Sequence, residues 1–446
     1  MSTLVQDPGP ATADAPVVPV RTSERLPSWW HLPTALTVLA LAALLVFGLG
    51  SPAADSTTFR LAAEGDLNPG GIVPGDVAIP ARVLAIVLAA LCLVIAGVLW
   101  WASATVTALG RWRTALVVVF GLLWVIAFLD WAFHGATVDV GAMLQTMMVL
   151  AVPLAFGALS GVLSERSGVI NIAIEGQLLM GAFGAVLVGS MVGSPWAGLI
   201  AAPVMSLLIG VLLALFAVGY RVQQIIVGVV LNVFAIGLTS FFFGTVMKQN
   251  PQMFNQPLRL PTLRIPLLAD LPVIGRVLFE QNILVYLMWI IVAVLTVALF
   301  RTRWGLRVRA VGEHPRAADT VGINVNGTRW GNVLLGSAVA GLGGATLTIG
   351  TGVAFGEEMS AGKGYIALAA MILGRYHPVG ALAAALLFAF TDALQLRLGT
   401  LPTGSGAGIP SQFLLMLPYI VTLFAVAGVV GRVRVPAADG VPYVKQ

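Results

Sequence analysis

A short polar segment, residues 164–176 with the sequence SERSGVINIAIEG, lies between two apolar runs that contain no charged residue. It holds four side chains that can form ion pairs or strong hydrogen bonds: Glu165, Arg166, Asn171 and Glu175. Charged and amide groups at membrane depth are costly unless they face water, protein or a ligand. An asparagine amide donates and accepts hydrogen bonds, and a carboxylate accepts several. The segment is therefore predicted to be a broken helix in which Asn171 and Glu175 line a path for a polar solute.

The same residues also fit a simpler interpretation, in which they only cap the start of a helix expected over residues 171–193. Two further candidates lie in the apolar segment 223–243. Asn232 carries a buried amide, which must hydrogen-bond either a neighbouring helix or a ligand. Thr239 can contact a ligand or bond back to its own helix. Both are candidate binding residues, and the packing alternative stays open for each.

A basic loop, residues 301–330, is the second segment with a distinctive pattern. It is rich in arginine: Arg301, Arg303, Arg307, Arg309, Arg316 and Arg329. Such an excess of positive charge predicts the cytosolic side of a membrane. Within the loop, Pro315 suits the first turn of a helix, Glu313 places negative charge near its positive end, and Gly322 suits the position after its last turn. The pattern predicts a short surface helix over residues 315–321.

The composition restricts the fold class. The chain has 446 residues, of which 58% are hydrophobic and 10% charged, whereas soluble proteins are about 25% charged. A soluble globular protein is thereby excluded, and an all-α polytopic helical membrane protein is predicted. The single cysteine, Cys92, excludes a disulfide framework and a thiolate metal cluster. The four histidines lack ligand spacing, so no metal site is expected. The basic excess favours membrane orientation over nucleic-acid binding.

Twelve spanning or part-spanning segments are expected along the chain. They lie near residues 33–50, 82–102, 114–134, 142–163, 171–193, 196–219, 222–246, 283–300, 331–351, 363–376, 378–396 and 411–431. An even number places both termini on one side, and most of the 24 Lys and Arg residues then lie on that side. The bias predicts a cytosolic N-terminus and a cytosolic C-terminus. Several segments are short or glycine-rich, so ten or eleven full crossings is an alternative.

Four regions follow from these segments: a disordered cytosolic tail (1–32), N-terminal membrane helices with a hydrophilic outer loop at 51–81 (33–140), a membrane core (141–431) and a cytosolic C-terminal tail (432–446). The core carries two interruptions. GVINIA at 168–173 and GYIALA at 364–369 are similar short runs that each lead into a Gly/Ala-rich helix. Paired interrupted segments indicate a transporter with pseudo-symmetric halves and a site near the membrane midplane.

The motifs also resemble a known family. SERSGVINIAIEGQLLMGAF, which starts at residue 164, and the stretch 359–388 are similar to the membrane subunits of bacterial ABC importers for nucleosides and simple sugars. The resemblance is closest to the second of the two paired permeases in nucleoside (purine-type) systems. RAVGEHPRAADTVGI at 309–323 resembles the coupling segment of these permeases, which docks in a groove of the ATPase subunit. The resemblance covers residues 141–431, and the role of residues 1–113 is left open.

The resemblance implies a transmembrane permease subunit of an ATP-driven nucleoside importer in the bacterial cytoplasmic membrane. Asn171, Glu175, Asn232 and Thr239 would contact base edges and ribose hydroxyls. The implied ATPase-coupling residues are Gly312, Glu313, His314, Pro315, Arg316, Ala317, Ala318, Asp319 and Gly322, with Ala317 and Ala318 on a small-residue face suited to a groove. The implied partners are an ABC ATPase that binds the ATP, a second related permease and an extracytoplasmic substrate-binding lipoprotein. No cofactor is expected in this chain.

Other functions remain open at this stage. A simple-sugar permease is the nearest alternative, and an ion-coupled secondary transporter would use Glu175 as its coupling carboxylate. A secondary transporter gives no reason for the 309–323 motif, and a membrane-embedded enzyme should cluster ionisable groups at membrane depth. The sequence has no GxxxxGK[ST] loop, so a transport subunit without its own ATPase site is expected. The pattern chooses neither among purines, pyrimidines and sugars nor between a homodimer and a heterodimer.

Overall fold

The computed structural model describes residues 31–52, 54–61, 75–104, 111–401, 413, 416 and 434–445. The chain divides into two compact units, one made of residues 1–50 and 82–129 and the other of residues 51–81 and 130–446. The expected disordered tail, apart from its last two residues, and the expected twelfth segment, apart from residues 413 and 416, lie outside the described residues.

The smaller unit is built from three helices: α1 (His31–Ala42), which continues as the π-helical turn η2 (Ala43–Gly48), most of α2 (Ala81–Ala104) and most of α3 (Arg111–Ala132). Its interior is apolar, and Cys92 lies fully buried there against Leu99 and Phe120. Cys92 therefore acts as a small buried hydrophobe. Large aliphatic side chains such as Val94 and Leu122 point outward, as expected of helices in lipid.

Two strands of a three-stranded sheet lie in the predicted outer loop, where no strand was expected. Strand β1 (Ser56–Arg60) pairs antiparallel with β2 (Asp76–Pro80), with Thr58 opposite Ala78. It pairs parallel with β3 (Thr137–Asp139), which runs directly into the first core helix. The buried hydroxyl of Thr57 donates to the carbonyl of Asp130 at 3.1 Å. Threonine-rich segments of this kind favour extended backbone, which explains strands in a loop of high polarity.

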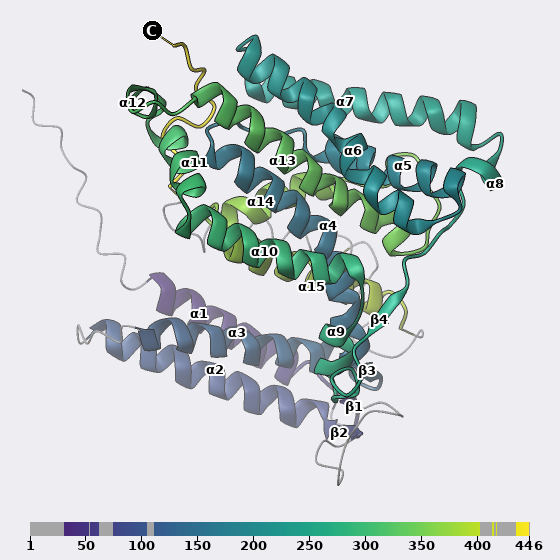
Figure 1. The fold of residues 1–446 in the computed structure, drawn as a ribbon. Helices are drawn as coiled ribbons and strands as arrows, with labels where there is room; N and C mark the ends of the chain where they lie inside the picture. The colour runs from purple at the N-terminus through teal and green to yellow at the C-terminus, as the bar shows by residue number, and fades with distance from the viewer. Residues whose placement is uncertain are drawn as a thin grey trace, which may run out of the picture. The chain divides into compact units, whose positions relative to one another are not determined.

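The larger unit continues with these elements: α4 (Val140–Arg166), α5 (Ile174–Val192), α6 (Pro195–Ala214), η4 (Leu215–Gly219), α7 (Gln224–Phe242), η5 (Phe243–Met247), α8 (Pro251–Phe254), β4 (Thr262–Arg264), α9 (Ile274–Phe279), β5 (Glu280–Asn282), α10 (Ile283–Arg301), α11 (Arg303–Glu313), α12 (Pro315–Thr320), α13 (Val325–Ala345), η6 (Thr346–Gly350), α14 (Lys363–Leu373) and α15 (Pro378–Leu398). Strands β4 and β5 pair antiparallel, with Leu263 opposite Gln281. Figure 1 shows α7 along the outside of α5 and α6.

Helices α4, α5 and α13 form the centre of this unit, and most of their residues are buried, whereas α6, α7 and α10 bury only about a third of theirs. Small residues permit the close packing. A Cβ atom added at Gly181 of α5 would overlap the backbone of Gly341 in α13, and one at Gly344 would overlap the backbone of α5. Helices that pack in lipid use such small residues because van der Waals contact, rather than hydrophobic burial, holds them together.

Among the described residues, ten helices are long and apolar enough to cross a membrane. They coincide with ten of the twelve expected segments, so the chain is a multi-pass, all-α membrane protein. The segment expected at 363–376 is a shorter helix, α14, of 11 residues. The basic loop differs from its prediction, because residues 303–313 form the helix α11. Its arginines suggested a loop, but Val308 and Val311 are buried while Arg307 is exposed, which makes α11 an amphipathic surface helix.

Candidate functional site

The polar segment is a true break between helices. Helix α4 ends at Arg166, α5 begins at Ile174, and the residues between them run without regular structure apart from short turns. Gly168 makes the turn after α4, with a φ of +87° that favours glycine. A Cβ atom there would lie 2.8 Å from a guanidinium nitrogen of Arg329 and 3.0 Å from the carbonyl oxygen of Ala438. The turn is therefore packed against a third helix and the C-terminal segment.

Asn171 lies at the centre of a buried hydrogen-bond network. Its amide nitrogen donates to Ser160 Oγ and to Gln177 Oε1, both at 3.1 Å, and its amide oxygen accepts from Gln177 Nε2 at 3.3 Å. Gln177 also donates to Ser337 Oγ of α13 at 2.9 Å. The network joins α4, the break, α5 and α13. Sequence reasoning missed the roles of Ser160, Gln177 and Ser337, although all three are polar residues in otherwise apolar helices.

Glu175 connects the two interruptions of the core. Its Oε1 atom accepts from Ser360 Oγ at 2.6 Å and from the backbone N–H of Gly362 at 2.8 Å. Its Oε2 atom accepts from the backbone N–H of Gly364 at 2.6 Å. Helix α14 begins at Lys363, so the carboxylate lies at the positive end of that helix, where negative charge is stabilising. The alternative that these residues cap the helix expected over 171–193 does not describe Glu175, because its carboxylate caps α14 and not α5.

Asn232 connects α7 to the break and to the start of α5 by hydrogen bonds. Its amide oxygen accepts from the backbone N–H of Gly176 at 2.8 Å, and its amide nitrogen donates to the carbonyl of Ile172 at 2.9 Å and to the Tyr365 hydroxyl at 3.1 Å. Asn232 is 1% exposed, whereas Tyr365 is 49% exposed. Tyr365 therefore connects this buried group to the surface of the chain.

Thr239 does not join the other three candidates. Its hydroxyl donates to the carbonyls of Ala235 and Ile236 in its own helix, at 2.8 and 3.1 Å. Asn171, Glu175 and Asn232 converge on the start of α5, and all four candidates are buried in this conformation. Each satisfies its polar atoms with protein partners, so substrate contact by these residues stays a prediction that requires some of these bonds to open.

A second polar cluster lies on the other side of the break and was not predicted. Buried Glu165 hydrogen-bonds the carboxyl of Asp439, the hydroxyl of Tyr376 and the backbone N–H of Asn171. Arg166 donates from Nε to the carbonyl of Tyr376 at 2.9 Å. Burial, together with the Glu165 carboxyl, raises the pKa of Tyr376. Burial also lowers the pKa of His377, and the nearby Arg166 guanidinium adds to this shift.

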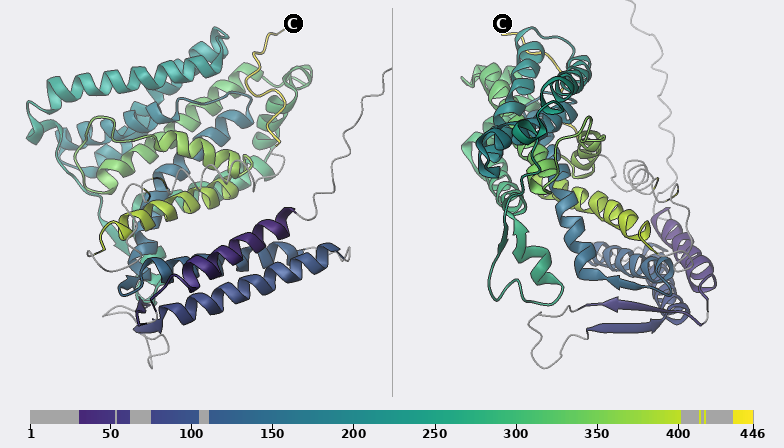
Figure 2. Two further views of the ribbon diagram at one scale, coloured as in Figure 1. Left: turned by 180° about the vertical axis from the view of Figure 1, so that it is seen from behind. Right: turned by 90° about the vertical axis from the view of Figure 1, so that its right-hand side faces the viewer.

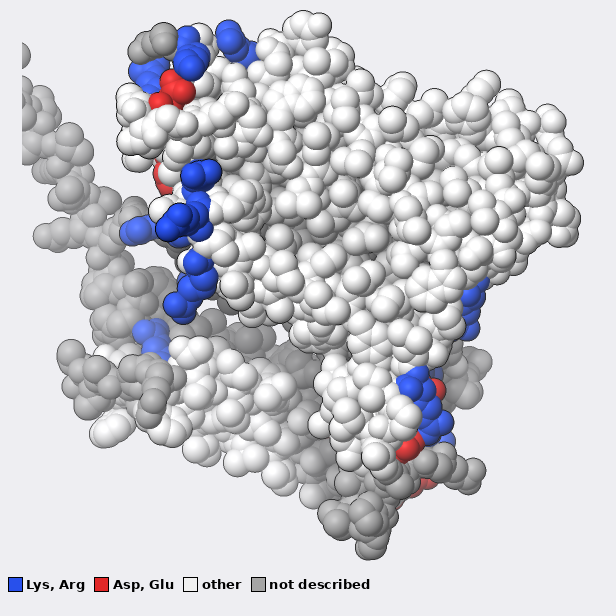
Figure 3. Space-filling view, in the orientation of Figure 1, with Lys and Arg blue, Asp and Glu red and all other residues white. Residues whose placement is uncertain are grey.

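The predicted surface helix is present as α12, Pro315–Thr320, and it ends where Gly322 adopts a φ of +84°. Arg316, Ala317 and Thr320 are exposed, and Val321 next to them is 74% exposed. Figure 3 shows lysine and arginine side chains along this edge of the molecule, beside an almost uncharged face. Val321 and Arg316 therefore lie on the accessible surface at α12, where the predicted contact with an ATPase requires them.

Other members of the coupling set contact the protein itself. Ala318 is 3% exposed and packs with Val311 and Val325, so its placement on a partner-facing surface with Ala317 was wrong. A Cβ atom at Gly312 would overlap the carbonyl of Arg166, which brings the coupling segment into direct contact with the break. The remaining members lie around α12: His314 is its N-cap residue, Asp319 hydrogen-bonds Tyr443, and Glu313 accepts from the backbone N–H of Ala437.

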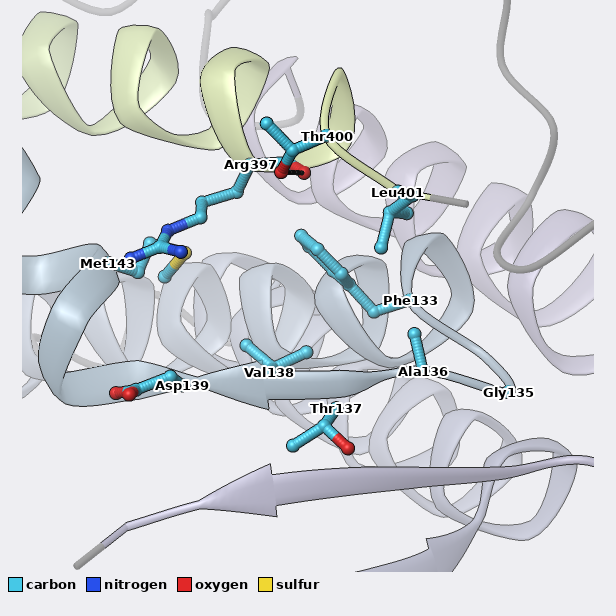
Figure 4. Close-up of a pocket in the computed structure, with 10 residues that line it drawn as sticks. All are labelled: Phe133, Gly135, Ala136, Thr137, Val138, Asp139, Met143, Arg397, Thr400 and Leu401. Atoms are coloured by element: carbon cyan, nitrogen blue, oxygen red, sulfur yellow. Dashed lines mark hydrogen bonds between the residues drawn. The ribbon is translucent and has the colours of Figure 1, made fainter. Parts of the chain in front are cut away.

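A cavity of about 390 Å³ lies where β3 and the start of α4 meet the end of α15. Figure 4 shows Arg397 reaching across it towards Met143, with Val138 and Phe133 on its walls. The Asp139 carboxylate at its rim caps α4 by accepting from the backbone N–H of Ala142 at 2.8 Å. None of the four candidate binding residues lines this cavity.

Comparison with known proteins gives a consistent family. Residues 143–426 match the family described as branched-chain amino acid transport system / permease component. The chain is 39% identical over 305 residues to the guanosine ABC transporter permease protein NupQ of Bacillus subtilis (strain 168), covering 67% of this chain and 95% of the relative. It is 38% identical over 306 residues to the nucleoside ABC transporter permease protein NupC of Lactococcus lactis subsp. cremoris (strain MG1363), with the same coverage of both chains.

A more distant relative is named for a different substrate. The putative glucose ABC transporter permease protein TsgC13 of Haloferax volcanii is 30% identical over 293 residues, covering 63% of this chain and 87% of the relative. No solved structure matches the chain.

Proposed function

The chain belongs to the branched-chain amino acid transport system permease component family, and from that premise we propose that it is the transmembrane subunit of an ATP-driven importer for nucleosides. One observation carries the mechanism: the coupling helix α12 is joined through Gly312 to the end of α4, directly before the break that holds Asn171 and leads to Glu175 at the start of α5. A push on α12 would therefore be felt at the start of α5. The two relatives with 38–39% identity, both named for nucleoside substrates, support a nucleoside rather than a sugar.

The proposed cycle divides the work between chains. A separate ABC ATPase binds and hydrolyses ATP and docks on Arg316, Ala317 and Val321 at the cytosolic end, a second related permease completes the membrane part, and an extracytoplasmic lipoprotein delivers substrate. The basic edge formed by α10, α11 and α12 supports a cytosolic position for this end of the larger unit. The excess of Lys and Arg on the expected inner side of the sequence supports the same side for both termini. The sequence offers no phosphate-binding GxxxxGK[ST] loop, in keeping with a subunit that holds no cofactor and no ATP.

Substrate contact is proposed for the group around α5. Tyr365 offers an exposed ring on which a base can stack and a hydroxyl already paired with Asn232. Asn232, Asn171 and Glu175 would supply donors and acceptors once the break opens. Thr239 would join them only if its bonds within α7 were exchanged.

The test is uptake into proteoliposomes that contain this chain, its ATPase and the second permease, with the binding protein outside. Labelled guanosine should accumulate only when ATP is supplied to the ATPase side, an uncoupler should have no effect, and excess glucose should not compete. Uptake that needs an ion gradient instead of ATP would overturn the proposal, and competition by glucose would replace the nucleoside with a sugar. The purified chain by itself should neither bind nor hydrolyse ATP.

A further inference from the structure

The C-terminal segment lies against the same end of the core as α11 and α12, where its yellow trace is visible in Figures 1 and 2. We call residues 436–443 the strap. Two hydrogen bonds attach it to the coupling segment: the N–H of Ala438 donates to the carbonyl of Gly312 at 2.9 Å, and the N–H of Ala437 donates to the Glu313 carboxylate at 3.2 Å.

An aromatic anchor holds the far end of the strap. Tyr443 is 7% exposed and packs in one apolar cluster with Val311 and Ala318. It also hydrogen-bonds Asp319 of α12. The neighbouring Val444 is 53% exposed. The strap therefore contacts α11 and α12 by packing as well as by hydrogen bonds.

The opposite side of the strap contacts the central helix α13. Arg329 is 1% exposed, and its Nη1 atom donates to the carbonyl of Val441 at 2.8 Å and its Nη2 atom to the carbonyl of Ala438 at 3.4 Å. A buried guanidinium is strongly unfavourable unless it is paired and hydrogen-bonded. The strap supplies both of these carbonyl acceptors and, in Asp439, a nearby negative charge.

The strap also contacts the break directly. The Asp439 carboxyl hydrogen-bonds the Glu165 carboxyl, which requires a proton between the two groups. A Cβ atom at Gly440 would lie 2.6 Å from Ile170 Cδ1, so the strap backbone touches the break closely. The contact is incompletely satisfied, because Asp439 Oδ1 and Arg329 Nε are buried without a hydrogen-bond partner among the described residues. Incomplete satisfaction lowers the cost of separating the strap from the core.

We propose that the strap is a positioning element that makes the coupling segment and the break move together during transport. It bonds Gly312 and Glu313 on one side and contacts Glu165 and Ile170 on the other, so a displaced α12 pulls the break through it. A strap that only fills space would affect assembly but not the yield of transport per ATP. This inference rests on the proposed function, since it requires an ATPase acting on α12.

The experiment uses the full importer in proteoliposomes and compares Tyr443→Ala with its exposed neighbour Val444→Ala. For each variant, nucleoside uptake and ATP hydrolysis are measured together after equal assembly has been checked. We expect Tyr443→Ala to hydrolyse at least as much ATP as the unaltered importer while transporting at least fivefold less per ATP. Val444→Ala should keep the original ratio, and Tyr443→Phe should recover most of it because the ring remains.

The outcomes separate the two proposals. If the unaltered importer shows no ATP-driven uptake, the proposed function fails. If it transports and Tyr443→Ala keeps the original uptake per ATP, the strap inference fails alone. If Tyr443→Ala does not assemble, Asp439→Ala replaces it, because this change removes the side chain that contacts Glu165 and lies near Arg329 while leaving the strap backbone in place. Uptake per ATP should again fall, and an unchanged ratio for Asp439→Ala would equally overturn the inference.

Discussion

Replacement of Glu175 by glutamine should loosen the junction between the two interruptions of the core. Glutamine keeps one carbonyl oxygen, which can still accept from Ser360 and Gly362, but its NH₂ group then faces the N–H donor of Gly364. The variant loses one charge-assisted hydrogen bond and leaves one buried donor unpaired, and each effect costs about 1–2 kcal/mol. We therefore expect the start of α14 to open about 2–4 kcal/mol more easily.

Hydrogen exchange measured by mass spectrometry on peptides covering residues 360–366 would test this value. Since 1.4 kcal/mol corresponds to about tenfold, the backbone N–H groups of Gly362 and Gly364 should exchange about 30 to 700 times faster in Glu175→Gln. Ser360→Ala removes only the side-chain donor and should have a smaller effect. Glu357→Gln makes the same chemical change at an exposed carboxylate of the same segment and serves as the control.

Equal exchange in Glu175→Gln and Glu357→Gln would refute the capping role. If exchange were unchanged but uptake were lost, Glu175 would instead act on the solute or on a coupled ion. The measurement thus distinguishes the two interpretations of Glu175 that the sequence left open, because only the structural one requires the backbone at 362–364 to become more accessible.

Three further predictions address other parts of the molecule. Ala317→Asp should abolish binding of the ATPase, measured by co-purification, without lowering the stability of the chain. Ala318→Asp should destabilise the chain itself because it buries a charge, and equal behaviour of the two variants would contradict the placement of α12. Tyr365→Ala should weaken nucleoside uptake more than Tyr365→Phe if the ring stacks on the base, and uptake equal to that of the unaltered chain in both would exclude that contact. Burial raises the pKa of the Asp439 carboxyl to about 7, so the docked strap favours the protonated form of Asp439, and docking should weaken as the pH rises from about 4 through 7. Hydrogen exchange of the backbone N–H groups at residues 437–441, corrected for intrinsic rates, should therefore become faster over this range. An opening free energy that stays constant with pH would disprove this prediction.

Helix α12 was predictable because its signals are local. Pro315 at its first turn and Gly322 after its last turn mark the ends within one short stretch of sequence, and the structure places α12 between them. The preceding helix α11 was missed although its pattern is also local. The spacing of Val308 and Val311 fits one helical face, but the surrounding arginines were interpreted only as a sign of membrane side.

The partners of the site residues could not be predicted, because they come from distant parts of the chain. Glu175 and Ser360 are 185 positions apart, and no local pattern shows that the carboxylate of one interruption caps the helix of the other. The same holds for Asp439, which meets Glu165 and Arg329 only in the folded protein. Sequence patterning located the polar break, whereas tertiary contacts decide what each polar atom of the break binds.

The buried state of the candidate residues restricts what kind of solute could displace their protein partners. Asn232 accepts one hydrogen bond and donates two, and three such bonds contribute about 2–4 kcal/mol in total. A solute that enters this site must supply an acceptor and a donor of its own, or these groups remain unpaired. Nucleobase edges present both kinds of group side by side, so a base can match the donor and the acceptor of Asn232, while the N–H of Gly176 and the carbonyl of Ile172 would need new partners. An apolar solute would replace none of these hydrogen bonds, so the free energy of all three would be lost. This favours polar substrates at this junction for a reason independent of any relative.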